Sequence, residues 1–360
     1  MHSKSFIVLF FLLLCSCGGG GSESSIVGPE EMPGEKVTQT LDIVTPSSDV
    51  ATNETFALEA SGLTPENTES LTFLWKVTES PQGSGAEILQ TGSALTTFKP
   101  DLPGQYLFSL TAYQGNEVLD TATATVTAKN PRIEQLGPVR ATKHPSMYSY
   151  IGDIVLAEES AVALAGNTTT LYTYLVFNPR TWEIIKEGRN EEFFLNHGSE
   201  LAFDGENVWA TSYGWSNGVP QTFVFKVDDS GIVIDKIDCP ASNTGGFCEG
   251  LAWDGENFWS GSDDNTDITC FDRTGEIVRV IENAWATVGR KQDLYYNQKT
   301  GRVVALKGTE ALLIDPETGM VLSSSNVQNL RNGDWDGSEW IQANNSTQEI
   351  EVFSVIETLP

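Results

Sequence analysis

The sequence predicts an all-β protein in which an immunoglobulin-like β-sandwich is followed by a five-bladed β-propeller, with six blades as the alternative. Three observations support this fold class. Short runs with alternating apolar and polar residues occupy residues 38–130, as in sheets with one buried face. Residues 131–360 contain repeats of 43 to 50 residues, a length typical of propeller blades. Turn signals of the Asp-Gly and Asp-x-x-Gly types separate the expected strands of each repeat.

Residues 1–17 have the features of an export signal and are excluded from the fold. An apolar run from Phe6 to Leu14 is too short to cross a bilayer as a mature helix. It ends in Leu14-Cys15-Ser16-Cys17, which resembles the bacterial lipobox with Cys17 as the lipid acceptor. The alternative is an ordinary secretory signal cleaved elsewhere. The resemblance implies a membrane partner through the acyl chains, and Gly18 after the cysteine implies an outer-membrane lipoprotein.

Residues 18–37 are predicted to be a flexible tether. They have no hydrophobic periodicity and are rich in Gly, Ser, Glu and Pro. A flexible chain of about 20 residues has a mean reach of roughly 25 Å, enough to hold a folded domain clear of a membrane surface.

Residues 38–130 are predicted to form the sandwich. The D-x-x-G-x-Y segment of Asp101, Gly104 and Tyr106, together with Trp75, resembles PKD-type immunoglobulin-like domains. The resemblance implies that the Tyr106 hydroxyl ties a loop to the sheet and that Trp75 is the core tryptophan. These are structural roles, so the sandwich is expected to act as a spacer.

Residues 131–360 are predicted to form the propeller. Residues 199–209 and 249–259 match almost residue for residue, and weaker copies occur at 153–163, 293–305 and 333–340. Each repeat is expected to form a four-stranded antiparallel blade. The last repeat lacks its outer strand, which residues 132–142 are expected to supply, closing the ring and removing an exposed edge.

Aromatic residues recur at one position of the repeats. A residue that returns in every blade is expected to pack neighbouring blades together, so these side chains are interpreted as core: Phe203, Trp253, Tyr295 and Trp335.

The charge balance narrows the range of partners. The chain has 49 acidic and 21 basic residues, a formal net charge of −28. Such a surface repels phosphate backbones, so nucleic acid is not expected as a partner. The expected partners are the membrane, through the anchor, and an unknown protein or glycan ligand.

Three cysteines follow the export signal. Cys239 and Cys248 flank a loop that contains Gly and Ser and are expected to form a disulfide in an oxidising compartment. Cys270 is then expected to be a buried thiol.

Acidic residues precede the innermost strand of each repeat, where a propeller brings its blades together. They are either ligands of an axial Ca²⁺ ion or solvated and backbone-bonded acids: Asp153, Glu200, Glu249, Asp293 and Asp334. Trp215 and Trp285 lie outside the repeats. They are expected either to contact a ligand or to plug the ends of the propeller.

No catalytic motif stands out, so the leading hypothesis is a lipid-anchored binding propeller of unknown ligand on an immunoglobulin-like spacer. Segments 213–216, 247–251 and 340–344 are similar to five-bladed glutaminyl cyclotransferases, which implies Glu249 as the group that transfers protons. A further glutamate of that family falls on Ala202 here. The alternative function is therefore an enzyme, either cyclotransferase-like or a metal-assisted hydrolase of the gluconolactonase type.

Overall fold

The computed structural model describes most of the chain after residue 39. The described ranges are 40–63, 71–143, 148, 150–166, 173–189, 200–216, 219–228, 230–242, 247–288, 292–328, 330–331 and 333–360. Cys17 and the tether lie outside them, and so does the side chain of Trp215. No helix in these ranges has the length and apolar character needed to span a membrane.

Two sheets form the sandwich. The smaller has the order β1-β3-β5, and the larger has the order β2-β7-β6-β4. Neighbouring strands are antiparallel except for the parallel pair of β2 and β7. The strands are β1 (Asp42–Val44), β2 (Val50–Ala51), β3 (Phe56–Ser61), β4 (Leu71–Glu79), β5 (Leu95–Phe98), β6 (Gly104–Gln114) and β7 (Glu117–Lys129).

The sandwich core contains the tryptophan and tyrosine expected from the sequence. Trp75 is 1% exposed, and its indole N–H donates to the Ser93 carbonyl oxygen at 2.7 Å. The Tyr106 hydroxyl donates to the Leu102 carbonyl oxygen at 2.8 Å and accepts from the Leu102 N–H at 3.1 Å. The tyrosine therefore ties the loop before β6 to the sheet, as the PKD resemblance implies.

Five four-stranded antiparallel sheets follow, here called blades 1 to 5. Blade 1 contains β9 (Tyr150–Ala157), β10 (Ser160–Gly166), β11 (Thr173–Phe177) and β12 (Ile184–Arg189). Blade 2 contains β13 (Leu201–Phe203), β14 (Val208–Ser216), β15 (Val219–Val227) and β16 (Val233–Asp238). A short 3-10 helix, η1 (Pro240–Ser242), precedes blade 3, which contains β17 (Cys248–Trp253), β18 (Phe258–Ser262), β19 (Ile268–Phe271) and β20 (Ile277–Ile281).

The last two blades complete the propeller. Blade 4 contains β21 (Gln292–Asn297), β22 (Arg302–Lys307), β23 (Glu310–Ile314) and β24 (Val321–Asn326). Blade 5 contains β25 (Gly333–Trp335), β26 (Glu339–Asn344), β27 (Glu349–Thr358) and β8 (Arg132–Lys143).

The first strand of each blade lies innermost and contacts the first strands of two other blades. The contacts run from β9 to β13, β17, β21 and β25, and then back to β9. Because these contacts close a ring, the propeller has five blades rather than the alternative six.

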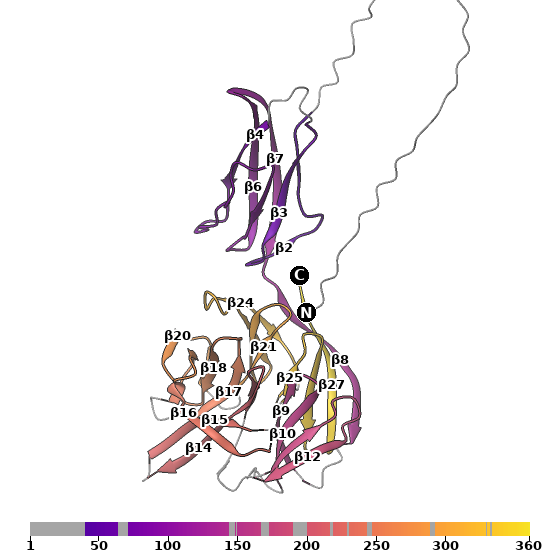
Figure 1. Cartoon of the computed structure of the whole chain (residues 1–360), viewed down its shortest axis with the longest axis vertical. Helices are drawn as coiled ribbons and strands as arrows, with labels where there is room; N and C mark the ends of the chain where they lie inside the picture. Colours follow the sequence, from indigo (N-terminus) through magenta and orange to yellow (C-terminus); the bar gives the residue numbers. More distant parts are fainter. Residues whose placement is uncertain are drawn as a thin grey trace, which may run out of the picture. The chain divides into compact units, whose positions relative to one another are not determined.

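The strand that closes the ring comes from the start of the propeller sequence. β8 pairs with β27 from Arg132, opposite Thr358, to Lys143, opposite Glu349. Figure 1 shows the two strands side by side, β8 in magenta and β27 in yellow. The strand expected from residues 132–142 is confirmed, and its pairing removes the exposed edge that β27 would otherwise present.

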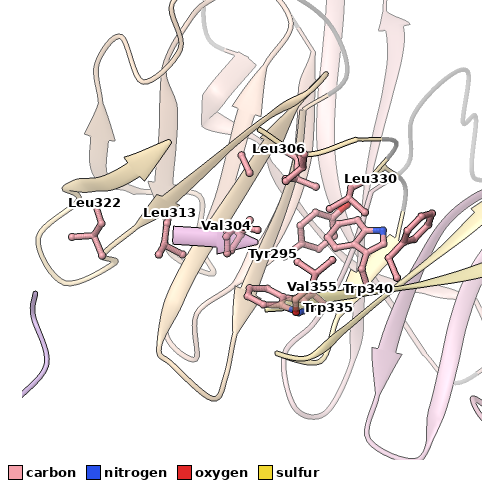
Figure 2. Close-up of a cluster of buried hydrophobic side chains, with 13 residues drawn as sticks. Tyr295, Val304, Leu306, Leu313, Leu322, Leu330, Trp335, Trp340 and Val355 are labelled. Carbon is pink, nitrogen blue, oxygen red and sulfur yellow. The ribbon is translucent and has the colours of Figure 1, made fainter. Parts of the chain in front are cut away.

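The propeller core is divided among the seams between blades. Each of five buried clusters combines residues of two neighbouring blades. Figure 2 shows the cluster between blades 4 and 5, in which the rings of Tyr295 and Trp340 meet edge to face with centroids 4.3 Å apart. Apolar burial thus fastens each blade to the next.

The repeated Asp-Gly turns end the inner strands of blades 2 and 3 in the same way. Asp204 accepts hydrogen bonds from two backbone N–H groups and, at 2.8 Å, from the indole of Trp209. Asp254 does the same with Trp259, at 2.7 Å. The turns therefore hold both a hairpin and a buried tryptophan.

Candidate functional site

Two groups of residues lie along the propeller axis. The first group is acidic and lies near the start of the inner strands, here called the strand-start end: Glu200, Glu249 and Asp293. The second group lines a cavity where the inner strands end in turns, here called the turn end. Each group is a candidate site.

Two of the five predicted axial acids join neighbouring blades. Asp153 of β9 accepts from the N–H of Leu201 in blade 2 at 2.7 Å, and from the N–H of Ile154 at 2.8 Å. Asp334 of β25 accepts from the N–H of Leu156 in blade 1 at 2.7 Å. Each carboxyl thus bridges the seam between two blades. Of the two alternatives given for these acids, hydrogen bonding to backbone N–H groups describes Asp153 and Asp334.

Burial shifts the protonation of both bridging acids. It raises the pKa of Asp153 well above its usual range, and the nearby charges of Asp293 and Asp334 add to the shift. Burial also raises the pKa of Asp334, to about 7. Both groups therefore bind a proton more readily than an exposed aspartate does.

Two of the other three acids, Glu200 and Asp293, form a buried pair at the strand-start end. Glu200 is 6% exposed and Asp293 is 4% exposed. Burial, followed by the charge of Asp293 and a hydrogen bond between the two side chains, raises the pKa of Glu200 well above its usual range. The pKa of Tyr150 is also raised, first by burial and then by the charge of Glu200. When two carboxyls share one proton, their pKa values move apart, so that one can act as an acid and the other as a base.

The predicted axial acids do not occupy one equivalent position in the repeats. Counted back from the turn residue of each blade, Glu200 and Asp293 are four positions away, Glu249 is five and Asp334 is two. Asp334 therefore lies nearer the turn end, whereas the charges of Asp293, Asp153 and Glu249 all act on Glu200. Within the described ranges, no group of three or more His, Cys, Asp or Glu side chains is arranged to hold a metal.

A cavity of about 370 Å³ occupies the turn end of the axis. Residues from the inner strands of all five blades line it, and so do the carboxyl-bearing residues Glu158, Asp334 and Asp336. The aromatic residues that line it are Phe203, Trp253, Tyr295, Tyr296 and Trp335. The cavity thus combines aromatic rings with acidic groups.

This cavity changes the interpretation of the repeated aromatics. Phe203 and Trp253 are only partly buried and line the cavity, although both also contact core clusters. The residue directly before the turn residue in blade 4 is Tyr296, not Tyr295, because the turn begins at Asn297. Tyr295 packs in the seam and also lines the cavity. The recurring position therefore serves the cavity as well as the core.

One cation of the chain already lies against an aromatic ring at the turn end. The Arg273 guanidinium carbon is 4.5 Å from the centroid of the Trp253 ring. The same guanidinium pairs with Asp204 at 3.1 Å. An aromatic face beside a carboxylate therefore holds a cation at this end of the propeller.

Trp285 is not an exposed ligand contact. It is 2% exposed and packs in the cluster between blades 3 and 4, with the Lys307 ammonium 5.5 Å from its ring centroid. The charge of Glu249 acts on Lys307. The buried ring of Trp285 packs in a seam between blades and leaves little surface for a partner.

Cys239 and Cys248 lie at the seam between blades 2 and 3, and Cys270 lies at the seam between blades 3 and 4. Cys239 and Cys248 form a disulfide with their Cα atoms 6.5 Å apart. Cys270 is a buried free thiol, and burial raises its pKa to about 12. A thiol with so high a pKa is a poor nucleophile, which assigns Cys270 to packing.

Comparisons with known proteins find similar solved structures only. No family model matches the chain, and no curated protein matches its sequence. Similar solved structures include a Myxococcus xanthus glutaminyl cyclase at 14% identity and TM-score 0.40, over 63% of this chain and 97% of that one. An auxiliary nutrient binding protein from Bacteroides ovatus has 10% identity and TM-score 0.38, over 89% of this chain and 83% of that one.

A third similar solved structure is a single domain. The PKD domain of human KIAA0319 is 19% identical with TM-score 0.22, over 28% of this chain and 92% of that domain. At these scores none of the three similarities supports an argument about ligand or activity.

Proposed function

We propose that this chain is a lipid-anchored protein of the cell envelope whose propeller binds a small ligand in the axial cavity, with the sandwich as a spacer. The observation that supports the binding site is the cavity at the turn end, to which all five inner strands contribute. Ligand sites in proteins are concave, are lined mostly by apolar and aromatic groups, and have a few convergent polar groups.

The lining favours an organic cation, such as a substituted ammonium group. Aromatic rings attract cations through their quadrupole, and carboxylates attract them by charge. Arg273, held between Trp253 and Asp204, is an example within the chain. The formal net charge of −28 also favours the approach of cations.

Titration calorimetry with choline and with phenyltrimethylammonium tests this proposal. We expect binding that weakens about tenfold in Trp253→Leu, in line with a cation–π contribution of about 1 to 2 kcal/mol. Phe223→Leu is the matched control, because the Phe223 ring also lies near a cation, 4.6 Å from the Lys236 ammonium, but does not line the cavity. Equal binding by the two variants, or none by the unmodified protein, would reject the axial site.

The anchor rests on Leu14-Cys15-Ser16-Cys17 and the Gly-rich segment after it. Cells that express the chain are grown with a fatty-acid probe. We expect Cys17→Ser to abolish labelling and to block cleavage of the signal. If the protein with Cys17 in place takes up no label and its N-terminus lies at another residue, the lipid-anchor proposal is wrong.

A second candidate function is proton-transfer catalysis at the strand-start end. The hydrogen-bonded pair of Glu200 and Asp293 supports it, and so does the proximity of Glu249 and Lys307. A peptide with N-terminal glutamine is the substrate to test. Its amine would attack the side-chain amide carbon and release ammonia. Ammonia release that is lost in Glu249→Gln would favour this function, whereas its absence at high enzyme concentration would remove it.

A further inference from the structure

A second cavity lies between blades 4 and 5, and none of the predicted axial acids lines it. Its volume is about 670 Å³. Residues of β8, β24, β26, β27 and the segment after β24 line it. Apart from Gly137 and Phe353, all the lining residues are polar: Gln135, Asn326, Gln328, Arg331, Gln342, Asn344 and Glu351.

A hydrogen-bonded network fixes the inner wall of this cavity. Gln342 is 1% exposed, and its carbonyl oxygen accepts from the indole of Trp340 at 2.9 Å and from the N–H of Arg331 at 3.0 Å. The amide of Gln342 donates to one oxygen of Glu351 at 3.0 Å. The amide of Asn344 donates to the other at 2.8 Å. The polar groups are therefore held in place before any ligand arrives.

The network leaves hydrogen-bonding capacity for a ligand. A primary amide has two N–H donors, and those of Gln342 and Asn344 each use one on Glu351. Each carboxylate oxygen of Glu351 can accept more than one hydrogen bond. The side chains of Asn326 and Arg331 are exposed at the rim.

We propose that this cavity is a binding site for a neutral saccharide. A hydroxyl group donates one hydrogen bond and accepts others, so a polyol matches a wall that presents amide donors beside carboxylate acceptors. The charges of Arg331 and Glu351 cancel, which gives no preference for an ionic ligand. Phe353 also lines the cavity, but it is 7% exposed and packs in the cluster between blades 4 and 5, so the polar groups carry the recognition.

This site is independent of the axial cavity in both composition and location. The axial lining is aromatic and acidic, whereas the amide-rich lining here contains a single aromatic residue. No residue belongs to both linings. The saccharide site can therefore exist whether or not the axial cavity binds a cation.

The test is titration calorimetry of the full chain with neutral hexasaccharides: maltohexaose, cellohexaose, xylohexaose and mannohexaose. Hexaglycine is the peptide comparison and sialyllactose the anionic one. We expect at least one neutral hexasaccharide to bind, and Arg331→Ala and Asn326→Ala each to weaken its affinity about fivefold or more. Both side chains are exposed, so neither substitution is expected to disturb folding.

Glu351→Gln tests the network itself. It preserves the shape of the side chain but replaces one acceptor oxygen with a donor, so we expect a loss of affinity of tenfold or more. Trp253→Leu, in the axial cavity, should leave saccharide affinity unchanged. The proposal is overturned if no neutral hexasaccharide binds, if only hexaglycine or sialyllactose binds, or if the rim and network variants bind as well as the natural sequence.

Discussion

Asp101 in the sandwich and Asp334 on the propeller axis are both hydrogen-bonded, yet their pKa values move in opposite directions. Burial acts to raise the pKa of Asp101, but hydrogen bonds from Ser84, Gly85 and Tyr106 outweigh it and lower the pKa. Asp334 accepts from two backbone N–H groups, and burial outweighs them. The balance between donors and burial thus separates a carboxylate that stays charged from an acid that can change its charge near neutral pH.

The largest expected effect is at the sandwich corner. Asp101→Ala removes the acceptor of bonds from Ser84 Oγ at 2.5 Å and the Gly85 N–H at 2.6 Å, and of the Tyr106 hydroxyl proton at 3.0 Å that Asp101 shares with the Leu102 carbonyl. We expect it to lower the free energy of unfolding by about 3 kcal/mol, because hydrogen bonds to charged groups are the strong ones. Denaturant unfolding, followed by a spectroscopic signal of the sandwich, measures this free energy.

Tyr106→Phe is the control for that prediction. It removes only the hydroxyl and leaves the charged acceptor with its other donors. We expect a loss of about 1 kcal/mol. A larger loss in Tyr106→Phe than in Asp101→Ala would mean that the hydroxyl, not the carboxylate, organises the corner.

The disulfide gives the next largest effect and should act on the propeller alone. Residues 38–130 contain no cysteine, whereas Cys239 and Cys248 are bonded across a sequence separation of 9. Removing the disulfide with Cys239→Ser and Cys248→Ser should cost about 2 to 3 kcal/mol of propeller stability. Non-reducing peptide mapping provides the parallel check, and Cys248 recovered in a bond to Cys270 would refute the pairing.

The smallest effect tests the pKa comparison directly. Because the folded-state pKa of Asp334 is raised to about 7, the folded protein holds a proton that the unfolded chain loses near pH 4. Its contribution to stability therefore falls as pH rises from about 4 to 7. Asp101, with a lowered pKa, contributes stability that is lost only as pH falls below about 4.

We therefore expect the melting temperature to decline between pH 5 and pH 8, and to decline by about 3 °C less in Asp334→Asn. Asp101→Asn should reduce stability, but its melting temperature should decline with pH as steeply as that of the natural sequence. The attribution to Asp334 fails if the two variants have the same slope.

The fold was more predictable from the sequence than the sites were. Near-identical repeats around Asp204 and Asp254 mark blades 2 and 3, because both blades use the same turn and the same buried tryptophan. A last repeat without its outer strand also implied that another segment must close the ring, and β8 does so.

The sites depend on features that do not repeat. Asp334 and Glu200 both appear in the sequence as acids before a strand, and only the structure separates the seam-bridging residue from the buried pair. The saccharide cavity was missed because its amides come from three strands of two blades and a connecting segment. The one signal was the density of Asn and Gln between Asn326 and Asn345.

The most direct test of the axial site compares tryptophans of the two domains in one sample. The indole N–H signals of Trp253, at the cavity, and Trp75, in the sandwich core, are assigned with single Trp→Phe variants and followed by NMR during a choline titration. The account predicts a saturable shift of the Trp253 signal while the Trp75 signal stays fixed. An unchanged Trp253 signal at saturating choline, or equal shifts of both signals, would contradict it.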